Sequence, residues 1–84
     1  MSDREESFSG VREAIVRTFA LRSGDSIAAG TTSADVPGWD SLSHSLLLMA
    51  IEERFGIDLP LDRVYEARNV GDLVDLVEAA RSHV

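Results

Sequence analysis

The chain has 84 residues, 44% of them hydrophobic, which is enough for one small core and predicts a single domain over residues 1–84. Its 15 acidic and 8 basic residues give a net charge of −7, which argues against nucleic-acid and anionic-membrane binding and favours basic protein partners. The sequence has neither Lys nor Cys, which excludes Schiff-base catalysis, thiol nucleophiles and thiolate metal sites.

A first helix is predicted near the N-terminus, because apolar residues recur there at helical spacing. The stripe consists of Phe8, Val11, Ile15 and Phe19. We expect this helix to end near residues 21–22. Several capping residues leave its start open. The candidates are Ser2 with Glu5 as a capping box, then Ser7, Ser9 and Gly10.

Residues 23–39 are rich in small and polar side chains, show no sustained periodicity and are typical of a long connection. We expect Ile27 and Val36 to anchor this loop to the core.

A second helix is predicted over residues 41–55, with Asp40 as its N-cap and Gly56 ending it in a left-handed conformation. Ser41 then lies in the first turn, where backbone N–H groups lack helical partners. The helix dipole there favours negative charge by about 0.3–1 kcal/mol, so an attached phosphate would be stabilised. The alternative is that Asp40 and Ser41 do no more than cap the helix.

The last third of the chain predicts one short and one longer helix. Residues 62–67 allow one or two helical turns that present Val64 and Ala67 inward. Asn69 is a favoured N-cap for a final helix. Its apolar repeat consists of Val70, Leu73, Leu76 or Val77, and Ala80. The predicted fold is therefore an all-α four-helix bundle with three longer helices, a short third helix and a long first loop.

Catalysis and metal binding find little support in the sequence. Ser41 and His44 lie three apart on a helix, but neighbouring residues supply no group to orient the base and no oxyanion site, so we expect no catalytic residues. We expect His44 to be a partly exposed helix residue, with a contact to a bound phosphate as a second hypothesis. His44 and His83 are far apart and the carboxylates follow no metal-ligand spacing, so no metal site is expected.

The longest apolar run, residues 46–51, is far shorter than the roughly 20 residues of a membrane span. The N-terminal residues also lack the order of a secretory signal. We therefore expect a cytoplasmic, monomeric, free-standing protein without membrane association.

The residues around Ser41 resemble the centre of acyl carrier proteins. The resemblance rests on residues 38–42 (Gly-Trp-Asp-Ser-Leu), residues 50–60 with their Ile-Glu-Glu-Arg-Phe-Gly-Ile core, and residues 69–73 (Asn-Val-Gly-Asp-Leu). It implies that Ser41 carries 4′-phosphopantetheine, with Asp40 and Leu42 completing the attachment motif. It also implies a Mg²⁺-dependent phosphopantetheinyl transferase, and acyl-loading and acyl-processing enzymes, as partners. The carrier itself would be no enzyme, and would hold acyl groups as thioesters.

Two further groups of residues are predicted to contact the acyl group and the partner enzymes. By the same resemblance, the acyl group rests between the second and third helices, where the candidate lining residues are Leu47, Ala50, Ile57, Val64 and Ala67. The apolar residues of the second helix exceed what one core face requires, which predicts an exposed partner surface. Its candidate residues are Leu46 and Met49, with Glu52 and Glu53 added by the resemblance.

The chain departs from the fatty-acid-synthesis pattern at Ser43, Ser45 and Leu46, so we expect partners in a specialised polyketide, lipid or related pathway. An aminoacyl or peptidyl carrier is one alternative. An unmodified helical interaction module, with Ser41 as a capping residue only, is the other.

Overall fold

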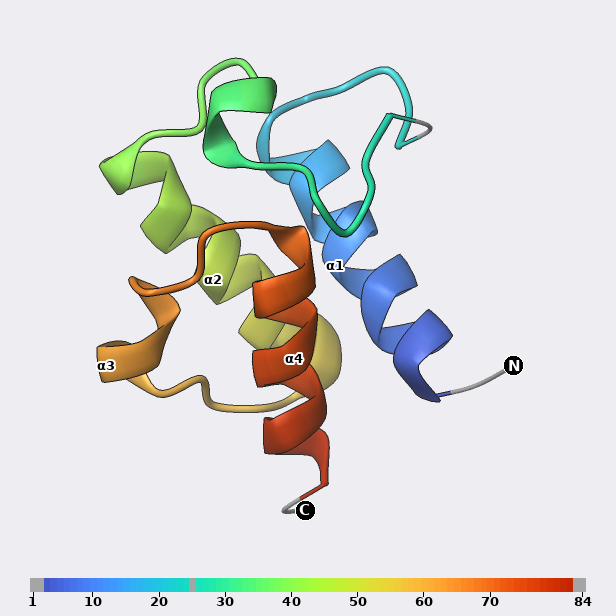
Figure 1. Ribbon diagram of the computed structural model, residues 1–84, viewed down its shortest axis with the longest axis vertical. Coiled ribbons are helices and arrows are strands. Elements are labelled where there is room, and N and C mark those ends of the chain that lie inside the picture. Colours follow the sequence, from blue (N-terminus) through green and yellow to red (C-terminus); the bar gives the residue numbers. More distant parts are fainter. Residues whose placement is uncertain (1–2, 25, 83–84) are drawn as a thin grey trace.

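The computed structural model describes residues 3–24 and 26–82, and that part of the chain is helical without strands. Figure 1 shows α1, α2 and α4 side by side, α3 as a single turn beside them, and the long first loop crossing one end. The predicted all-α bundle is confirmed. The helices are α1 (Asp3–Thr18), α2 (Ser41–Phe55), α3 (Leu61–Val64) and α4 (Val70–Arg81), with a 3₁₀ turn, η1 (Ser33–Asp35), in the loop.

Helix α1 ends at Thr18, so the prediction that it continues to residues 21–22 was wrong. The reason is Ala20, which adopts a left-handed backbone with φ of 52°. The Leu21 N–H then donates to the Val16 carbonyl at 2.9 Å, which is the closing bond of a Schellman motif. A left-handed Ala is costly and therefore hard to foresee, because Gly usually fills this position.

The start of α1 at Asp3 favours the earliest of the predicted starts, although Ser2 itself lies outside the described residues. Ser7, Ser9 and Gly10, the later candidates, lie inside the helix. Gly10 has a packing role there, because a Cβ on it would overlap the Phe55 ring of α2. This glycine allows α1 and α2 to approach closely.

The core forms where α1 packs against both α2 and α4, with α3 seated on α4. Ile27 and Val36 are buried against it, as predicted, and hold the first loop to the bundle. The largest fully buried apolar side chains are Val11, Ile15, Leu47, Ile51, Val64, Val70, Leu73, Val74 and Val77. Every helix thus contributes to one core.

Helices α2 and α4 begin where the sequence predicts. Asp40 caps α2, and Asn69 caps α4 by accepting from the Asp72 N–H at 2.9 Å. Gly56 ends α2 with φ of 64°, the left-handed conformation expected of it. The capping signals of these two helices are strong because each is a side-chain hydrogen bond that only a few residue types can make.

Helix α3 ends at Val64 and does not reach Ala67, which corrects the predicted range of 62–67. A longer helix would bond the Arg68 N–H to the Val64 carbonyl. Instead the Arg68 N–H donates to the Asp72 carboxylate at 2.9 Å, and the Val64 carbonyl accepts from His44 at 3.0 Å. Val64 is buried as predicted, whereas Ala67 is half-buried in the link to α4.

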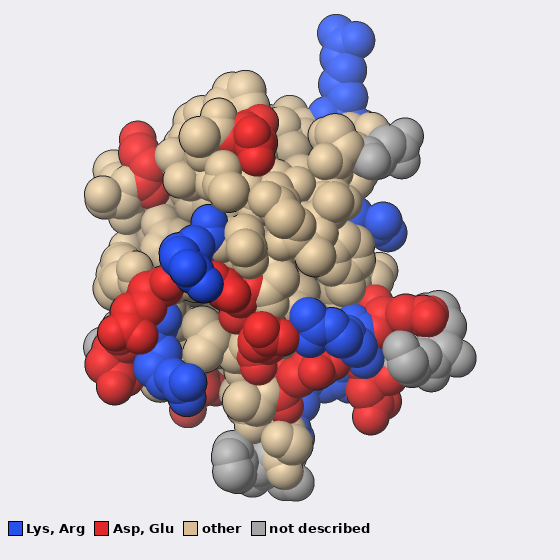
Figure 2. Space-filling view, in the orientation of Figure 1, with Lys and Arg blue, Asp and Glu red and all other residues tan. Residues whose placement is uncertain are grey.

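Charged side chains gather at one end of the molecule. Figure 2 shows them over the lower half of this face, where α3 and α4 lie, and few over the first loop. Arg4 of α1 pairs with Asp75 of α4 at 2.7 Å, and Arg81 of α4 pairs with Glu6 of α1 at 3.3 Å. Arg4, Asp75 and Glu6 are exposed in these pairs, so water screens the charges and the pairs add little to the stability of the fold.

Within residues 3–24 and 26–82, none of the helices has the length and apolar character that crossing a membrane requires. The same described residues hold no group of His, Asp and Glu side chains arranged to bind a metal ion.

Candidate functional site

Ser41 is the first residue of α2, and its side chain is exposed. It follows the turn through Gly38, whose φ of 88° directs the chain into the helix. The N–H groups of this first turn lack helical carbonyl partners, and the helix dipole places partial positive charge there. The position therefore suits a covalently attached phosphate, and a second protein's active site can reach its hydroxyl.

The cap beside Ser41 is a reciprocal pair. The Asp40 carboxylate accepts from the Ser43 N–H at 2.9 Å, and the Ser43 hydroxyl oxygen accepts from the Asp40 N–H at 2.8 Å. The Ser43 hydroxyl in turn lies 2.6 Å from the Gly38 carbonyl, to which it can donate. Hydrogen bonds from the Ser43 backbone and side chain lower the pKa of Asp40. This arrangement fixes the start of α2 and hence the position of Ser41.

Acid should destabilise the fold in part through Asp40. Because its pKa is lowered on folding, the stability that it adds is present above its ordinary pKa and is lost as the pH falls through the lowered value. Asp40→Asn keeps the capping oxygen but does not titrate. Urea unfolding of both proteins, from about pH 6 to about pH 2.5, should show the parent losing its advantage over the variant. A constant difference across that range would contradict this.

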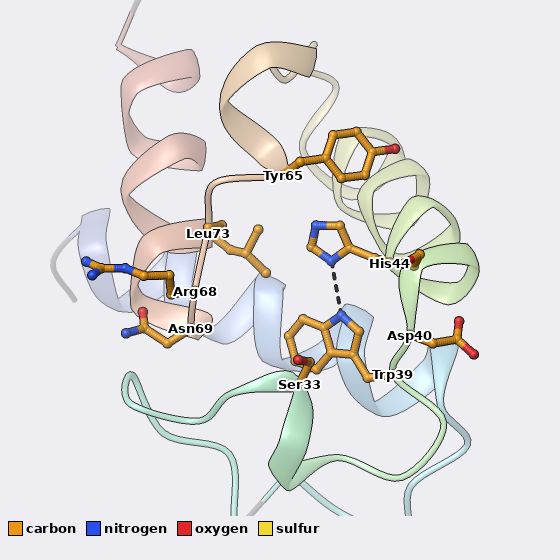
Figure 3. Close-up of a pocket in the computed structure, with 10 residues that line it drawn as sticks. Ser33, Trp39, Asp40, His44, Tyr65, Arg68, Asn69 and Leu73 are labelled. Carbon is orange, nitrogen blue, oxygen red and sulfur yellow. Dashed lines mark hydrogen bonds between the residues drawn. The ribbon is translucent and has the colours of Figure 1, made fainter.

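A hollow of about 350 Å³ opens beside Ser41. In Figure 3 the rings of Trp39, His44 and Tyr65 point into it from one side, with Leu73 opposite, whereas the Asp40 carboxylate points away. Its wall comes from the loop, the start of α2, the segment after α3 and the start of α4. The lining residues are Ser33, Trp39, Asp40, Ser41, His44, Tyr65, Ala67, Arg68, Asn69 and Leu73.

His44 holds this wall together. The Trp39 indole N–H donates to its Nδ1 at 3.0 Å, and its Nε2 lies 3.0 Å from the Val64 carbonyl. Because an indole N–H can only donate, Nδ1 is the acceptor and the proton is on Nε2, which makes the ring neutral. The hypothesis of a cationic His44 facing a phosphate therefore does not fit. Both nitrogens are engaged away from Ser41, so His44 is not placed as its base either.

The five candidates for the acyl lining separate in the structure. Ala67 lines the hollow beside Ser41, whereas Ala50 lines another one, between α1 and α2. Leu47, Ile57 and Val64 are buried in the core. The structure thus brings only Ala67 of this set to the hollow, because α2 turns Ala50 toward α1.

The candidate partner surface lies along the outer side of α2. Leu42, Leu46 and Met49 are 76%, 54% and 64% exposed, which is unusual for large apolar side chains in one helix. Glu53 is exposed nearby, whereas the Glu52 carboxylate accepts from the Leu59 N–H at 2.9 Å and so holds the link after α2. Glu52 is therefore less available to a partner than Glu53.

Several residues of the hollow escaped the sequence analysis, Tyr65 above all. Its hydroxyl lies 3.1 Å from that of Ser45, and its ring stands 5.7 Å from the His44 ring. Tyr65 follows α3 directly, and no spacing in the sequence links it to α2. Its status as the one tyrosine in the sequence was the only available signal.

The chain is similar to known proteins. Residues 10–77 match the family model described as a phosphopantetheine attachment site. The chain is 44% identical over 43 residues to an acyl carrier protein of Tropheryma whipplei, covering 51% of this chain and 52% of that protein. It is 36% identical over 58 residues to an acyl carrier protein of Sinorhizobium fredii, covering 69% and 74%. The chain thus spans about half the length of the Tropheryma protein and more of the second.

The fold is similar to that of a holo acyl carrier protein from Geobacter metallireducens, solved by NMR in solution. The TM-score is 0.81 at 28% identity, and the match covers 92% of this chain and 87% of that one. The similarity therefore extends over most of the chain.

Proposed function

Since this chain belongs to the acyl carrier protein family, whose members carry covalent 4′-phosphopantetheine, we propose that Ser41 is the residue that bears the group. The observation that carries this is the exposed hydroxyl at the first residue of α2, inside the matched range and set by the Asp40–Ser43 cap. When bound, the group supplies a thiol that holds an acyl chain as a thioester. The role of the protein is to carry and present that chain.

Loading requires nothing catalytic from this chain. The Ser41 oxygen bonds to the phosphorus atom of coenzyme A that bears pantetheine. The bond from this phosphorus to the oxygen that bridges the two phosphates breaks, and adenosine bisphosphate leaves. The serine proton passes to a base of the partner transferase, whose Mg²⁺ stabilises the charge on the phosphates. Asp40 and Leu42 present Ser41, since the first fixes the helix start and the second is exposed beside it.

Mass spectrometry tests the attachment. The purified protein is incubated with coenzyme A, Mg²⁺ and a broad-specificity phosphopantetheinyl transferase, and should gain the mass of one phosphopantetheinyl group. No gain under conditions in which a known carrier is fully loaded would overturn the proposal and favour an unmodified interaction module.

The partner enzymes should dock on the exposed apolar side of α2. We expect a cytoplasmic monomer that serves acyl-loading and acyl-processing enzymes. We expect these enzymes to belong to a specialised pathway, because Leu46 and Ser43 make this surface more apolar and less acidic. An aminoacyl carrier would use the same serine, so its own loading enzymes decide between these cargoes. Several enzymes can dock one after another only if this surface is exposed to solvent. Leu42 and Met49 are exposed.

Leu46→Glu should slow acyl loading by the true partner by about tenfold or more, the effect of losing a contact worth about 1.4 kcal/mol. Leu46 is exposed, so the helical circular dichroism should not change. The rate is measured by mass spectrometry on holo-protein at limiting enzyme. Ala79→Glu, which adds the same charge at an exposed position of α4, outside this surface, serves as the control for a simple change of charge. Equal rates for Leu46→Glu and the parent would place the docking surface elsewhere.

A further inference from the structure

The joint between α2 and α3 is closed by two polar bridges beside the hollow. His44 of α2 meets the carbonyl of Val64, the last residue of α3, at 3.0 Å. The next residue of each segment repeats the pattern, because the Ser45 and Tyr65 hydroxyls lie 3.1 Å apart. Two successive residues of α2 are thus bonded to two successive residues at the end of α3.

The first bridge is also part of a run of rings. The Trp39 and His44 rings meet at their hydrogen-bonded edges, with centroids 6.0 Å apart, and Phe19 stacks on Trp39 at 5.5 Å. The Tyr65 ring tilts against His44 at 5.7 Å. The neutral His44 ring is held from both nitrogens and packed between two aromatic neighbours, so it cannot turn aside without breaking both hydrogen bonds.

Val64 and Leu47 lie behind these bridges, and both are almost fully buried. An aliphatic chain that enters the core at this joint, between His44 and the end of α3, would have to displace His44. Displacement would leave the Trp39 N–H and the Val64 carbonyl without partners in a half-buried setting, which is costly. The hollow in front of the bridges needs no such rearrangement.

We propose that His44 is a specificity-determining residue that closes the core to long aliphatic chains, so that the cargo is a compact acyl group resting in the open hollow against the rings of Trp39 and Tyr65. This rests on the proposed attachment at Ser41. The hollow supports it chemically, since aromatic faces and Leu73 line one part and Arg68 and Asn69 the other. Such a mixed lining suits a short group better than a chain of methylenes.

The test compares three cargoes on the intact chain. Acetyl, decanoyl and phenylacetyl forms are made with the transferase from the corresponding coenzyme A thioesters, and mass spectrometry confirms each loading. Failure to load would overturn the proposed function and is seen before any cargo is compared. The readouts are the rate of thioester cleavage by hydroxylamine, and the NMR signals of the Leu47 and Val64 methyl groups and of the Trp39 and Tyr65 rings.

On the parent chain, the acetyl and decanoyl thioesters should be cleaved at the same rate, with the core methyl signals alike in both. The phenylacetyl form should shift the Trp39 and Tyr65 ring signals relative to the acetyl form. Decanoyl protection of about tenfold, equivalent to about 1.4 kcal/mol of burial, or movement of the core methyl signals, would overturn the proposal. So would unchanged ring signals in the phenylacetyl form.

His44→Ala should open the joint, and its decanoyl thioester should be cleaved about tenfold more slowly than its acetyl thioester. A merely structural role of His44 would not create this dependence on chain length. His83→Ala, which removes the other histidine of the sequence, should behave like the parent. Equal rates for both thioesters in a His44→Ala protein with parental circular dichroism would overturn the proposal. If His44→Ala does not fold, the measurements on the parent chain alone decide whether the proposal holds.

Discussion

Ser41→Ala should abolish the phosphopantetheinyl mass gain completely. The alanine variant has no oxygen at the first position of α2 to form the phosphodiester, and no other serine of the helix can replace it. Ser43 is bonded within the cap, and Ser45 lies more than a turn further on against Tyr65. The loading reaction is run to completion for the parent, and both proteins are then weighed.

The matched control is Ser45→Ala, which removes a serine hydroxyl from the same helix and should load fully. Alanine is a good helix former, so Ser41→Ala should keep the parental circular dichroism and unfolding midpoint. A mass gain that survives Ser41→Ala would show that another residue is modified. In that case the cap beside Ser41 would have only a structural role.

Ile51→Ala should lower the free energy of unfolding by about 2–5 kcal/mol. Ile51 is 0% exposed, at the point where α2 faces the core, so the substitution removes buried methyl groups and leaves a cavity in a small domain. Since domains of this kind are stable by about 5–15 kcal/mol in total, the loss is a large share. Urea unfolding followed by circular dichroism measures it, with an unchanged denaturant slope expected.

Met49→Ala is the control for this second prediction. It truncates a large apolar side chain of the same helix that is 64% exposed, so it should change stability by less than about 0.5 kcal/mol. A similar loss for both variants would mean that α2 is buried on both sides, for example against a second protein. A negligible loss for Ile51→Ala would contradict the assigned core face of α2.

The bundle could be predicted where a single side chain sets a boundary. Asp40, Gly56 and Asn69 each act on the backbone within a few residues of themselves, so the helix ends that they set can be predicted from the sequence. The apolar repeat fixes the faces of the long helices for the same reason. Local chemistry therefore sufficed for α2 and α4.

The errors arose from a tertiary contact at α3 and from an uncommon local conformation at the end of α1. Helix α3 stops at Val64 because His44, distant in sequence, takes its carbonyl, and α1 stops early because Ala20 accepts a conformation that usually needs glycine. The hollow beside Ser41 was missed for a similar reason. Tyr65 and Arg68 line it from the segment after α3, and the sequence does not indicate that α3 ends after one turn.

The stacked rings give this protein a built-in optical reporter. Trp39 is its one tryptophan, lies half-buried between Phe19 and His44, and borders the same hollow as Ser41. Indole emission depends on the polarity and hydrogen bonding around the ring, so its wavelength and intensity come from this one place. Ultraviolet fluorescence of the unlabelled protein can therefore follow events beside Ser41 in real time, at concentrations and speeds that suit stopped-flow mixing.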